Sequence, residues 1–210
     1  MPLESQQSNQ VTVMVSDALA PAKVQNLRYT VSQGKVSLAW DPVTTNSDSS
    51  PLTDLAAYRV YRKDDEGSSP VLVGTVASTI DNQVTNFDDT TMLDGASYLY
   101  IVTAVDNEAT PNESVASDEL PVKTIPSVPQ NLQATSGDGH THLTWDSVLD
   151  GGNAKKNENL AGYNVYRSDD GGATFNKIGS VDKNTLSYQD NTVAIGQQYI
   201  YAVTAFDNSP

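Results

Sequence analysis

The 210-residue sequence contains no cysteine, two histidines and only 12 lysine and arginine residues. The missing cysteines exclude a disulfide framework, a zinc–thiolate site and a cysteine nucleophile. The 26 acidic residues give a formal net charge of −14, which argues against a nucleic-acid partner because phosphate binding needs positive charge. Apolar runs are only as long as a strand, so we expect no membrane insertion.

Catalytic groupings are missing as well. The sequence contains no recognisable Ser/His/acid set, phosphate-cradling glycine loop or pair of carboxylates, and we expect no enzymatic activity. Sustained helical periodicity is also absent. Short alternating segments are instead separated by turns rich in Asp, Gly, Ser and Asn, which predicts an all-β chain.

The chain contains one unit twice. Trp40 and Trp145 lie 105 positions apart, and residues 98–107 return as residues 199–208. Each unit has about 100 residues, enough to fold without disulfides or metals, so two domains are expected. Alternation predicts which side chains point inward, because residues two apart share one face of a strand. The aromatic residues expected in the two cores are Trp40, Tyr58, Tyr98, Trp145, Tyr163 and Tyr199.

These repeated residues resemble the fibronectin type III family, in the form common in bacterial extracellular proteins. The resemblance rests on two early tryptophans, two Tyr-x-Val-Tyr-Arg segments and two segments similar to the tyrosine corner that opens strand F: Trp40 and Trp145, residues 58–62 and 163–167, and residues 95–98 and 196–199. It implies two immunoglobulin-like sandwiches in tandem, each with seven strands. Strand G of the first sandwich would lie at residues 114–122.

The two ends of the chain resemble complementary parts of one sandwich. In the second copy, no segment that matches strand G follows residues 199–208 in the given sequence. Five residues near the start match strand G of the first copy at a constant offset of 109: Glu4, Ser5, Ser8, Val11 and Val13 correspond to Glu113, Ser114, Ser117, Leu120 and Val122. We therefore expect an orphan strand at residues 1–16, a complete domain at 20–124 and a domain incomplete at strand G at 125–210.

Two interpretations of the orphan strand stay open. In one, it completes domain 2 of a neighbouring copy by donor-strand complementation, because an edge without its partner exposes unpaired amides. Such head-to-tail contacts close into rings or continue as filaments. The interface would then contain Val11, Val13 and Val15 beside Tyr201, Val203 and Ala205. In the other interpretation, the strand ends a preceding domain of a longer array.

Three further features support weaker hypotheses. Residues 168–175 resemble an Asp-box, whose composition suits a tight hairpin turn. His140 and His142 share the outward face of one strand, but a dedicated metal site needs more ligands. Calcium is the one cofactor considered, although no acidic cluster has the spacing of an EF-hand loop and solvated turns are the default. Its candidate ligands are Asp106, Asn107, Glu108, Asp207 and Asn208.

The sequence therefore predicts a non-catalytic structural protein that is secreted or at the cell surface. It would serve as a spacer in a longer array or assemble head to tail with copies of itself. The alternative is an accessory, carbohydrate-associated module of a secreted glycoside hydrolase, with polysaccharide or adjacent domains as partners, because such domains are frequent in the resembled family. The first seven residues do not resemble a signal peptide, so an export signal either was removed or is not used.

Overall fold

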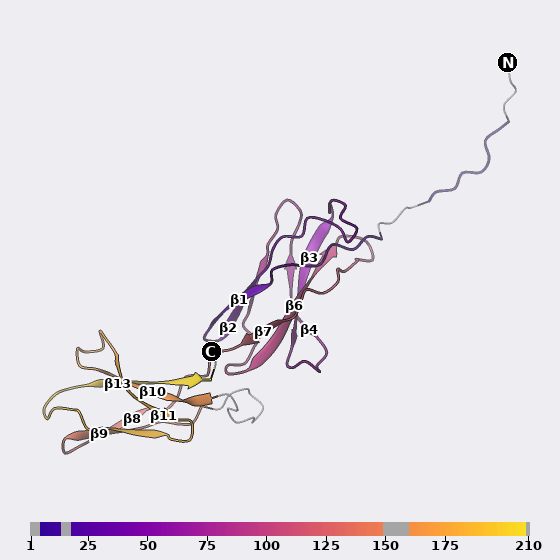
Figure 1. Ribbon diagram of the computed structural model, residues 1–210. Helices are drawn as coiled ribbons and strands as arrows, with labels where there is room; N and C mark the ends of the chain where they lie inside the picture. The colour runs from indigo at the N-terminus through magenta and orange to yellow at the C-terminus, as the bar shows by residue number, and fades with distance from the viewer. Residues whose placement is uncertain (1–4, 14–17, 149–159, 209–210) are drawn as a thin grey trace.

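The computed structural model describes residues 5–13, 18–148 and 160–208, and its regular structure is strand (Figure 1). In these residues no helix is long and apolar enough to cross a bilayer. The strands form four antiparallel sheets, two in each half of the chain, so each half is a β-sandwich. The predicted fold class, two immunoglobulin-like sandwiches in tandem, is confirmed.

The first sandwich has seven strands: β1 (Arg28–Ser32), β2 (Lys35–Ala39), β3 (Leu55–Lys63), β4 (Val71–Ala77), β5 (Asn86–Asp89), β6 (Ser97–Asp106) and β7 (Leu120–Lys123). One sheet has the order β1-β2-β5 and the other the order β4-β3-β6-β7. These orders correspond to strands A-B-E and C′-C-F-G of a fibronectin type III-like fold, so β6 is strand F and β7 is strand G.

The second sandwich repeats this arrangement with six strands in the described residues: β8 (Gln133–Gly137), β9 (His140–Thr144), β10 (Leu160–Ser168), β11 (Asn176–Asp182), β12 (Ser187–Asp190) and β13 (Ile200–Asp207). Its sheets have the orders β8-β9-β12 and β11-β10-β13. Strand F is β13, and no described strand pairs with its outer edge. The assignment of residues 125–210 to a domain incomplete at strand G stays a prediction.

Each sandwich buries one tryptophan against one tyrosine between its sheets. The ring centroids of Trp40 and Tyr58 lie 5.3 Å apart at 62°, and those of Trp145 and Tyr163 lie 5.5 Å apart at 63°. This is the edge-to-face geometry that aromatic pairs prefer. These four residues and Tyr98 are buried as predicted.

The prediction that the sixth aromatic residue, Tyr199, lies in the core is wrong. Tyr199 is half-buried, lies just before β13, and does not belong to the core cluster of the second sandwich. Its counterpart Tyr98 is 5% exposed and pairs with Val122 of β7. Among the described residues, Tyr199 has no strand beside it in that position, and its ring stays accessible to solvent.

The two copies also share a close approach between their sheets. A Cβ atom on Gly74 of β4 would lie 2.3 Å from the ring of Phe87, and one on Gly179 of β11 would lie 2.5 Å from the ring of Tyr188. Real Cβ atoms do not come so close, so both strands need glycine where the aromatic ring of the opposite sheet packs. The repeat in the sequence is therefore also a repeat of packing.

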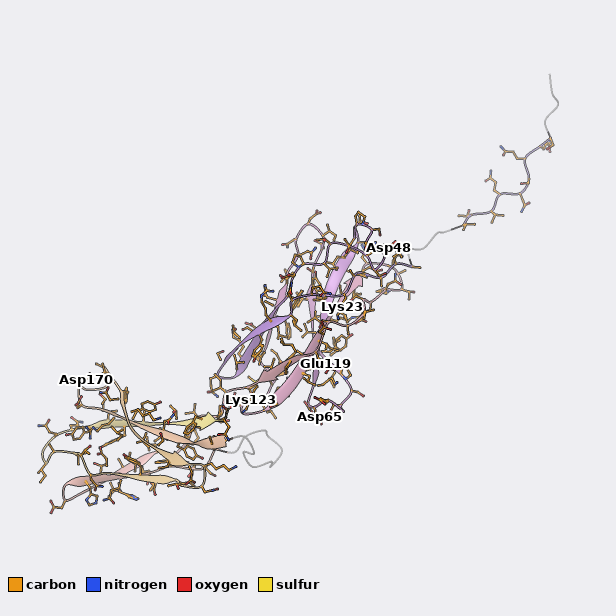
Figure 2. The ribbon with its side chains drawn as sticks, viewed as in Figure 1. Lys23, Asp48, Asp65, Glu119, Lys123 and Asp170 are labelled. Atoms are coloured by element: carbon orange, nitrogen blue, oxygen red, sulfur yellow. The ribbon has the colours of Figure 1, made fainter. Side chains whose placement is uncertain are left out.

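A short restrained linker joins the sandwiches. The carbonyl of Ile125 accepts a hydrogen bond from Gly95 N (2.9 Å), which fixes the start of the linker on the first sandwich. Pro126 and Pro129 are both buried. Lys123, which Figure 2 labels near the junction, also has its Nζ 3.0 Å from the carboxylate of Asp207 at the end of β13, and this ion pair connects the two sandwiches.

The N-terminal segment differs from the prediction. Residues 5–13 extend away from the first sandwich and form no strand (Figure 1). Val11 and Val13 are 76% and 75% exposed, while Val15 lies outside the described residues. A strand exists only where another backbone accepts its hydrogen bonds, and no described segment lies beside this one. The assignment of residues 1–16 to strand G of a neighbouring domain stays a prediction.

Candidate functional site

One buried carboxylate links the two sheets of the first sandwich. Asp89, at the end of β5, is 1% exposed, and its Oδ2 accepts hydrogen bonds from Arg62 and Tyr100, both at 2.7 Å. Its Oδ1 accepts bonds from the backbone N–H and the hydroxyl of Thr91, both at 2.8 Å. The Arg62 guanidinium also lies 4.7 Å from the centroid of the Tyr98 ring. Both carboxylate oxygens therefore have protein donors.

The second sandwich repeats this network. Asp190 accepts hydrogen bonds from Arg167 (2.8 Å), Tyr201 (3.0 Å) and both donor groups of Thr192 (2.9 and 2.6 Å). Arg167 lies 4.7 Å from the centroid of the Tyr199 ring. Burial raises the pKa of both aspartates, but their hydrogen bonds outweigh it and hold each pKa below the ordinary value of 3.8. Both groups are ionised at neutral pH and fasten the sheets together.

Tyrosine corners open strand F in both sandwiches. The hydroxyl of Tyr98 accepts a hydrogen bond from Leu93 N (2.9 Å), and that of Tyr199 accepts one from Ala194 N (3.1 Å). This is the local contact that the fibronectin type III resemblance implies for the segments ending at these tyrosines.

The positions considered for calcium do not come together. Asp106 is 1% exposed; Oδ1 accepts bonds from Asn112 N (2.8 Å) and Glu108 N (3.3 Å), and Oδ2 accepts one from Asn112 Nδ2 (2.7 Å). It therefore caps the loop after strand F, while Asp207 pairs with a lysine at the junction. The other two candidates, Asn107 and Asn208, are exposed. In residues 5–13, 18–148 and 160–208, no three acidic or histidine side chains form a group that could hold a metal.

The Asp-box segment is a structural hairpin. Ser168 Oγ accepts a bond from Gly172 N (2.8 Å) and donates to Asp170 Oδ1 (2.6 Å). Asp170 also accepts bonds from the backbone N–H (2.9 Å) and the hydroxyl (2.6 Å) of Thr174. The bonds from Ser168 and Thr174 lower the pKa of Asp170. Because all these contacts lie within the loop at whose tip Asp170 is labelled in Figure 2, the turn interpretation is confirmed.

The two histidines lie on β9 without the further ligands of a metal site. The ring of His140 covers Gly137, where a Cβ atom would lie 2.3 Å from it, and its Nδ1 lies 3.1 Å from the carbonyl of Asp138. His142 is exposed. In the part of the chain that the structure describes, neither histidine belongs to a group of three side chains that could hold a metal ion.

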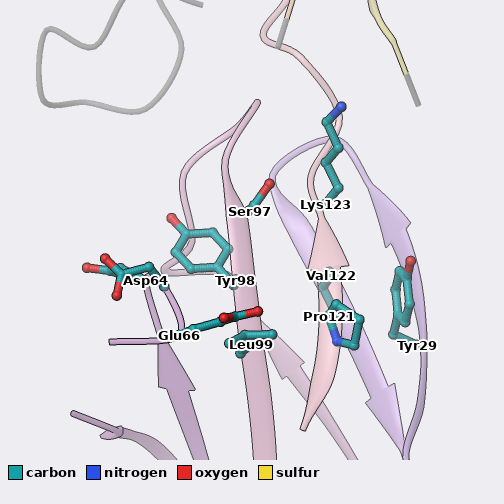
Figure 3. Close-up of a pocket in the computed structure, with 10 residues that line it drawn as sticks. Tyr29, Asp64, Glu66, Ser97, Tyr98, Leu99, Pro121, Val122 and Lys123 are labelled. Atoms are coloured by element: carbon teal, nitrogen blue, oxygen red, sulfur yellow. The ribbon is translucent and has the colours of Figure 1, made fainter. Parts of the chain in front are cut away.

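An open pocket of about 390 Å³ lies on the first sandwich (Figure 3). Tyr29 stands on one side of β7, and Asp64, Glu66 and Tyr98 lie on the other. Tyr29 is 42% exposed, whereas Tyr98 is held beneath the Arg62 guanidinium. The pocket therefore presents one accessible aromatic ring and three carboxylates, those of Asp64, Asp65 and Glu66.

The edge of β6 is covered by backbone pairing and by serine hydroxyls. Its first four residues pair with β7. Farther along, the hydroxyls of Ser117 and Ser114 accept hydrogen bonds from Val102 N (3.0 Å) and Ala104 N (2.9 Å). The N–H groups of the same serines donate to the carbonyls of Val102 (3.0 Å) and Ala104 (2.8 Å). Two serines therefore satisfy the backbone N–H and carbonyl groups of β6 beyond the point where its pairing with β7 ends.

Sequence reasoning missed two groups of residues. Glu113 accepts bonds from Thr103, Tyr61 (2.7 Å) and Arg59 on the outer face of the sheet. Burial raises the pKa of Glu113, but these bonds outweigh it and hold the pKa below 4.5. The second group is the buried aspartate network with its arginine and tyrosine. Its signal was available, because these charged and polar residues are identical in the two copies.

No protein-family model matches the chain. Parts of it are similar to three amylopullulanases: 36% identical over 91 residues to that of Thermoanaerobacterium saccharolyticum, 32% over 103 residues to that of Thermoanaerobacterium thermosulfurigenes, and 39% over 85 residues to that of Thermoanaerobacter thermohydrosulfuricus. The alignments cover 43%, 49% and 40% of this chain. They cover only 6%, 5% and 5% of the relatives, so the chain spans a small fraction of their length.

Among solved structures, the chain is similar to the FN1–FN3 domains of chicken contactin (CNTN1). The superposition has a TM-score of 0.41 and 15% sequence identity, and covers 90% of this chain and 63% of that one.

Proposed function

We propose that the chain is a non-catalytic accessory module of a large secreted polysaccharide-degrading enzyme. One observation carries this proposal: the chain is 32–39% identical to short segments of three amylopullulanases, while each alignment covers only 5–6% of the relative. A segment of that size fits a module beside the catalytic part of such an enzyme better than the catalytic part itself. Secretion of this chain is part of the same proposal.

The arrangement of the acidic groups supports a structural role. The most buried carboxylates, those of Asp89, Asp106 and Asp190, accept hydrogen bonds from neighbouring protein groups. A net charge of −14 keeps such a surface soluble through self-repulsion. The linker with its two buried prolines and the ion pair between the sandwiches favour a spacer that holds other domains apart.

The pocket on the first sandwich is the surface we assign to polysaccharide. Tyr29 offers an apolar ring face of the kind that packs against sugar rings, and the nearby carboxylates of Asp64 and Glu66 can accept hydrogen bonds from hydroxyl groups. The pocket is open, which suits a chain-like ligand that passes across it.

Affinity electrophoresis of the 210-residue chain in gels containing pullulan or amylopectin tests the proposal. We expect retardation that Tyr29→Ala reduces and that Ile195→Ala, a change of an exposed apolar residue in the second sandwich, leaves unchanged. Equal mobility with and without both polysaccharides would overturn the carbohydrate contact and leave the spacer role. Release of reducing sugar from pullulan by the purified chain would overturn the non-catalytic assignment.

A second candidate function is head-to-tail self-assembly by strand exchange. The observation that favours it is the coexistence of an exposed alternating segment, with Val11 and Val13, and an outer edge of β13 that no described strand covers. Light scattering of the whole chain beside a variant lacking residues 1–15 tests it. We expect assemblies that disappear on truncation, whereas a monodisperse monomer in both cases would exclude strand exchange.

A further inference from the structure

We propose that the edge of β13 binds residues 5–13 of a second copy in one defined register, with two serine hydroxyls accepting from its amides. In this register Ser8 faces Val203 and Ser5 faces Ala205. This inference rests on the strand exchange proposed above and adds the register, the recognition contacts and the identity of the partner molecule.

The register follows from the first sandwich. Val203 and Ala205 are the counterparts of Val102 and Ala104, whose amides donate to two serine hydroxyls. Positions 117 and 114, which carry those serines, correspond at the offset of 109 to Ser8 and Ser5. The same offset places Val11 and Val13 at the positions of Leu120 and Val122, which pair with Tyr100 and Tyr98. Val11 and Val13 would therefore lie beside Tyr201 and Tyr199, the half-buried rings of the second sandwich.

Ser5 and Ser8 already make the local hydrogen bond that accompanies this contact in the first sandwich. In the first sandwich the hydroxyls of Ser114 and Ser117 donate to the carbonyl of the next residue, at 3.0 Å in both cases. Each oxygen keeps a lone pair for the amide of β6. In the unpaired N-terminal segment, Ser5 and Ser8 also donate to the next carbonyl, at 3.2 Å in both cases. The oxygens of Ser5 and Ser8 therefore also keep a lone pair that can accept from an amide.

The N-terminal segment of the same molecule cannot reach the edge of β13. In the proposed register Val13 lies beside Tyr199, at the end of the second sandwich that points away from the first. The N-terminal segment enters the first sandwich at the end far from the second sandwich (Figure 1), where the carbonyl of Ala20 accepts from Ser47 N. Seven residues span at most roughly 25 Å. The ten residues of β6 and the eight of β13, laid end to end, span roughly 60 Å.

A second copy meets no such limit. The first sandwich of the donor copy would lie next to the second sandwich of the recipient copy. This arrangement repeats the one between the first and second sandwiches within a single chain. From Val122 to Leu132 the chain advances ten residues, whereas from Val13 to the equivalent Leu27 it advances fourteen. The connection is therefore long enough, and each added copy leaves a new open edge. The contact is heterologous and propagates.

Cross-linking between two variants tests the register, because the natural chain has no cysteine. The pair Leu99 and Pro121 of the first sandwich corresponds to Ile200 and Thr12. Directly opposed residues of antiparallel strands have Cα atoms about 4.5–5.5 Å apart, within reach of a disulfide. We expect mixed Thr12→Cys and Ile200→Cys chains to form a covalent heterodimer under mild oxidation. Gln7→Cys in place of Thr12→Cys is the control and should not cross-link to Ile200→Cys.

Serine variants test the recognition contacts separately. The double variant Ser5→Ala/Ser8→Ala should weaken assembly about ten-fold, while Gln6→Ala/Gln7→Ala should leave it unchanged, measured as the concentration of half-assembly in light scattering. Assembly with unchanged affinity in the serine variant, or cross-linking through Gln7→Cys, would overturn the register while strand exchange stood. A monomeric parent chain that forms no heterodimer would overturn both.

Discussion

The two sandwiches share their internal contacts and differ along strand F. Both contain the Trp–Tyr pair, the tyrosine corner and the aspartate that joins the sheets. In the first, Tyr98 and Tyr100 are at most 5% exposed, whereas Tyr199 and Tyr201 in the second are half-buried. Among the described residues, the first core cluster contains 15 buried residues and the second contains seven.

This difference distinguishes the strands that determine the arrangement of the sheets from the strand that completes the burial of the strand F side chains. The second sandwich keeps the same strand order and network geometry although none of its described strands occupies position G. Strands A, B, C, C′, E and F therefore suffice for the arrangement of the sheets, and strand G contributes mainly buried area and hydrogen-bond partners for the amides of strand F. Substitutions at equivalent positions of the two sandwiches test this distinction.

The largest effect is expected from neutralising the buried aspartates. Asp89→Asn removes the charge that faces Arg62, whose side chain is only 17% exposed, and should destabilise the first sandwich by about 3 kcal/mol. Asp190→Asn should cost less, about 2 kcal/mol, because Tyr201 is half-buried and its bond is longer, 3.0 Å against 2.7 Å. Urea unfolding can follow each sandwich through its single tryptophan, with Trp145→Phe or Trp40→Phe silencing the other.

The same pair of variants predicts a pH dependence. A carboxylate whose pKa is lower in the folded state stabilises the fold above its unfolded pKa, and this contribution disappears as pH falls through the folded value. Parent stability should therefore decline as pH falls below about 3.8, and the gap between the parent and Asp89→Asn should close. A gap that stays constant down to pH 2 would contradict the charge-based explanation.

A smaller loss is expected from the serines that close the edge of β6. Ser114→Ala together with Ser117→Ala leaves two amides of strand F without acceptors and should destabilise the first sandwich by about 2 kcal/mol. Val115→Ala, at a 75% exposed position between them, is the control and should change stability little. Equal stability of the double variant and the parent would mean that water replaces these hydroxyls at no cost.

Much of the fold could be predicted from the sequence, because alternation, turn residues and an in-register repeat all indicate the same sandwich. The prediction that Tyr199 lies in the core was wrong for a physical reason. The burial of this side chain depends on a strand beside β13 and not on the segment that contains Tyr199. The contacts of Asp106, a candidate calcium ligand, could not be predicted, because its partners are backbone and amide groups of the following loop, which spacing does not reveal. The role of Arg62 was missed because a charged residue on a strand also suits a solvated face.

A gain of stability is expected where the second sandwich lacks a contact that the first has. Asp94 accepts bonds from Gln33 and from Gly34 N (3.2 Å) at the hairpin between β1 and β2. Its counterpart Ile195 is 84% exposed beside the equivalent hairpin. Ile195→Asn supplies an acceptor without adding charge and should stabilise the second sandwich by about 0.5 kcal/mol. Asp94→Ala should cost the first sandwich a similar amount, and a loss in the Ile195 variant would show that the hairpins are not equivalent.

The smallest effect is expected at the ion pair between the sandwiches. Lys123 and Asp207 have side chains that are 28% and 16% exposed, so their attraction is partly screened by water and salt. Because Asp207 also takes part in another interaction, single variants mix two effects. A double-mutant cycle with Lys123→Gln and Asp207→Asn isolates the pair, and we expect a coupling free energy of about 0.5 kcal/mol that shrinks in 1 M salt. A coupling near zero at low salt would mean that the linker alone, with its buried prolines, joins the second sandwich to the first.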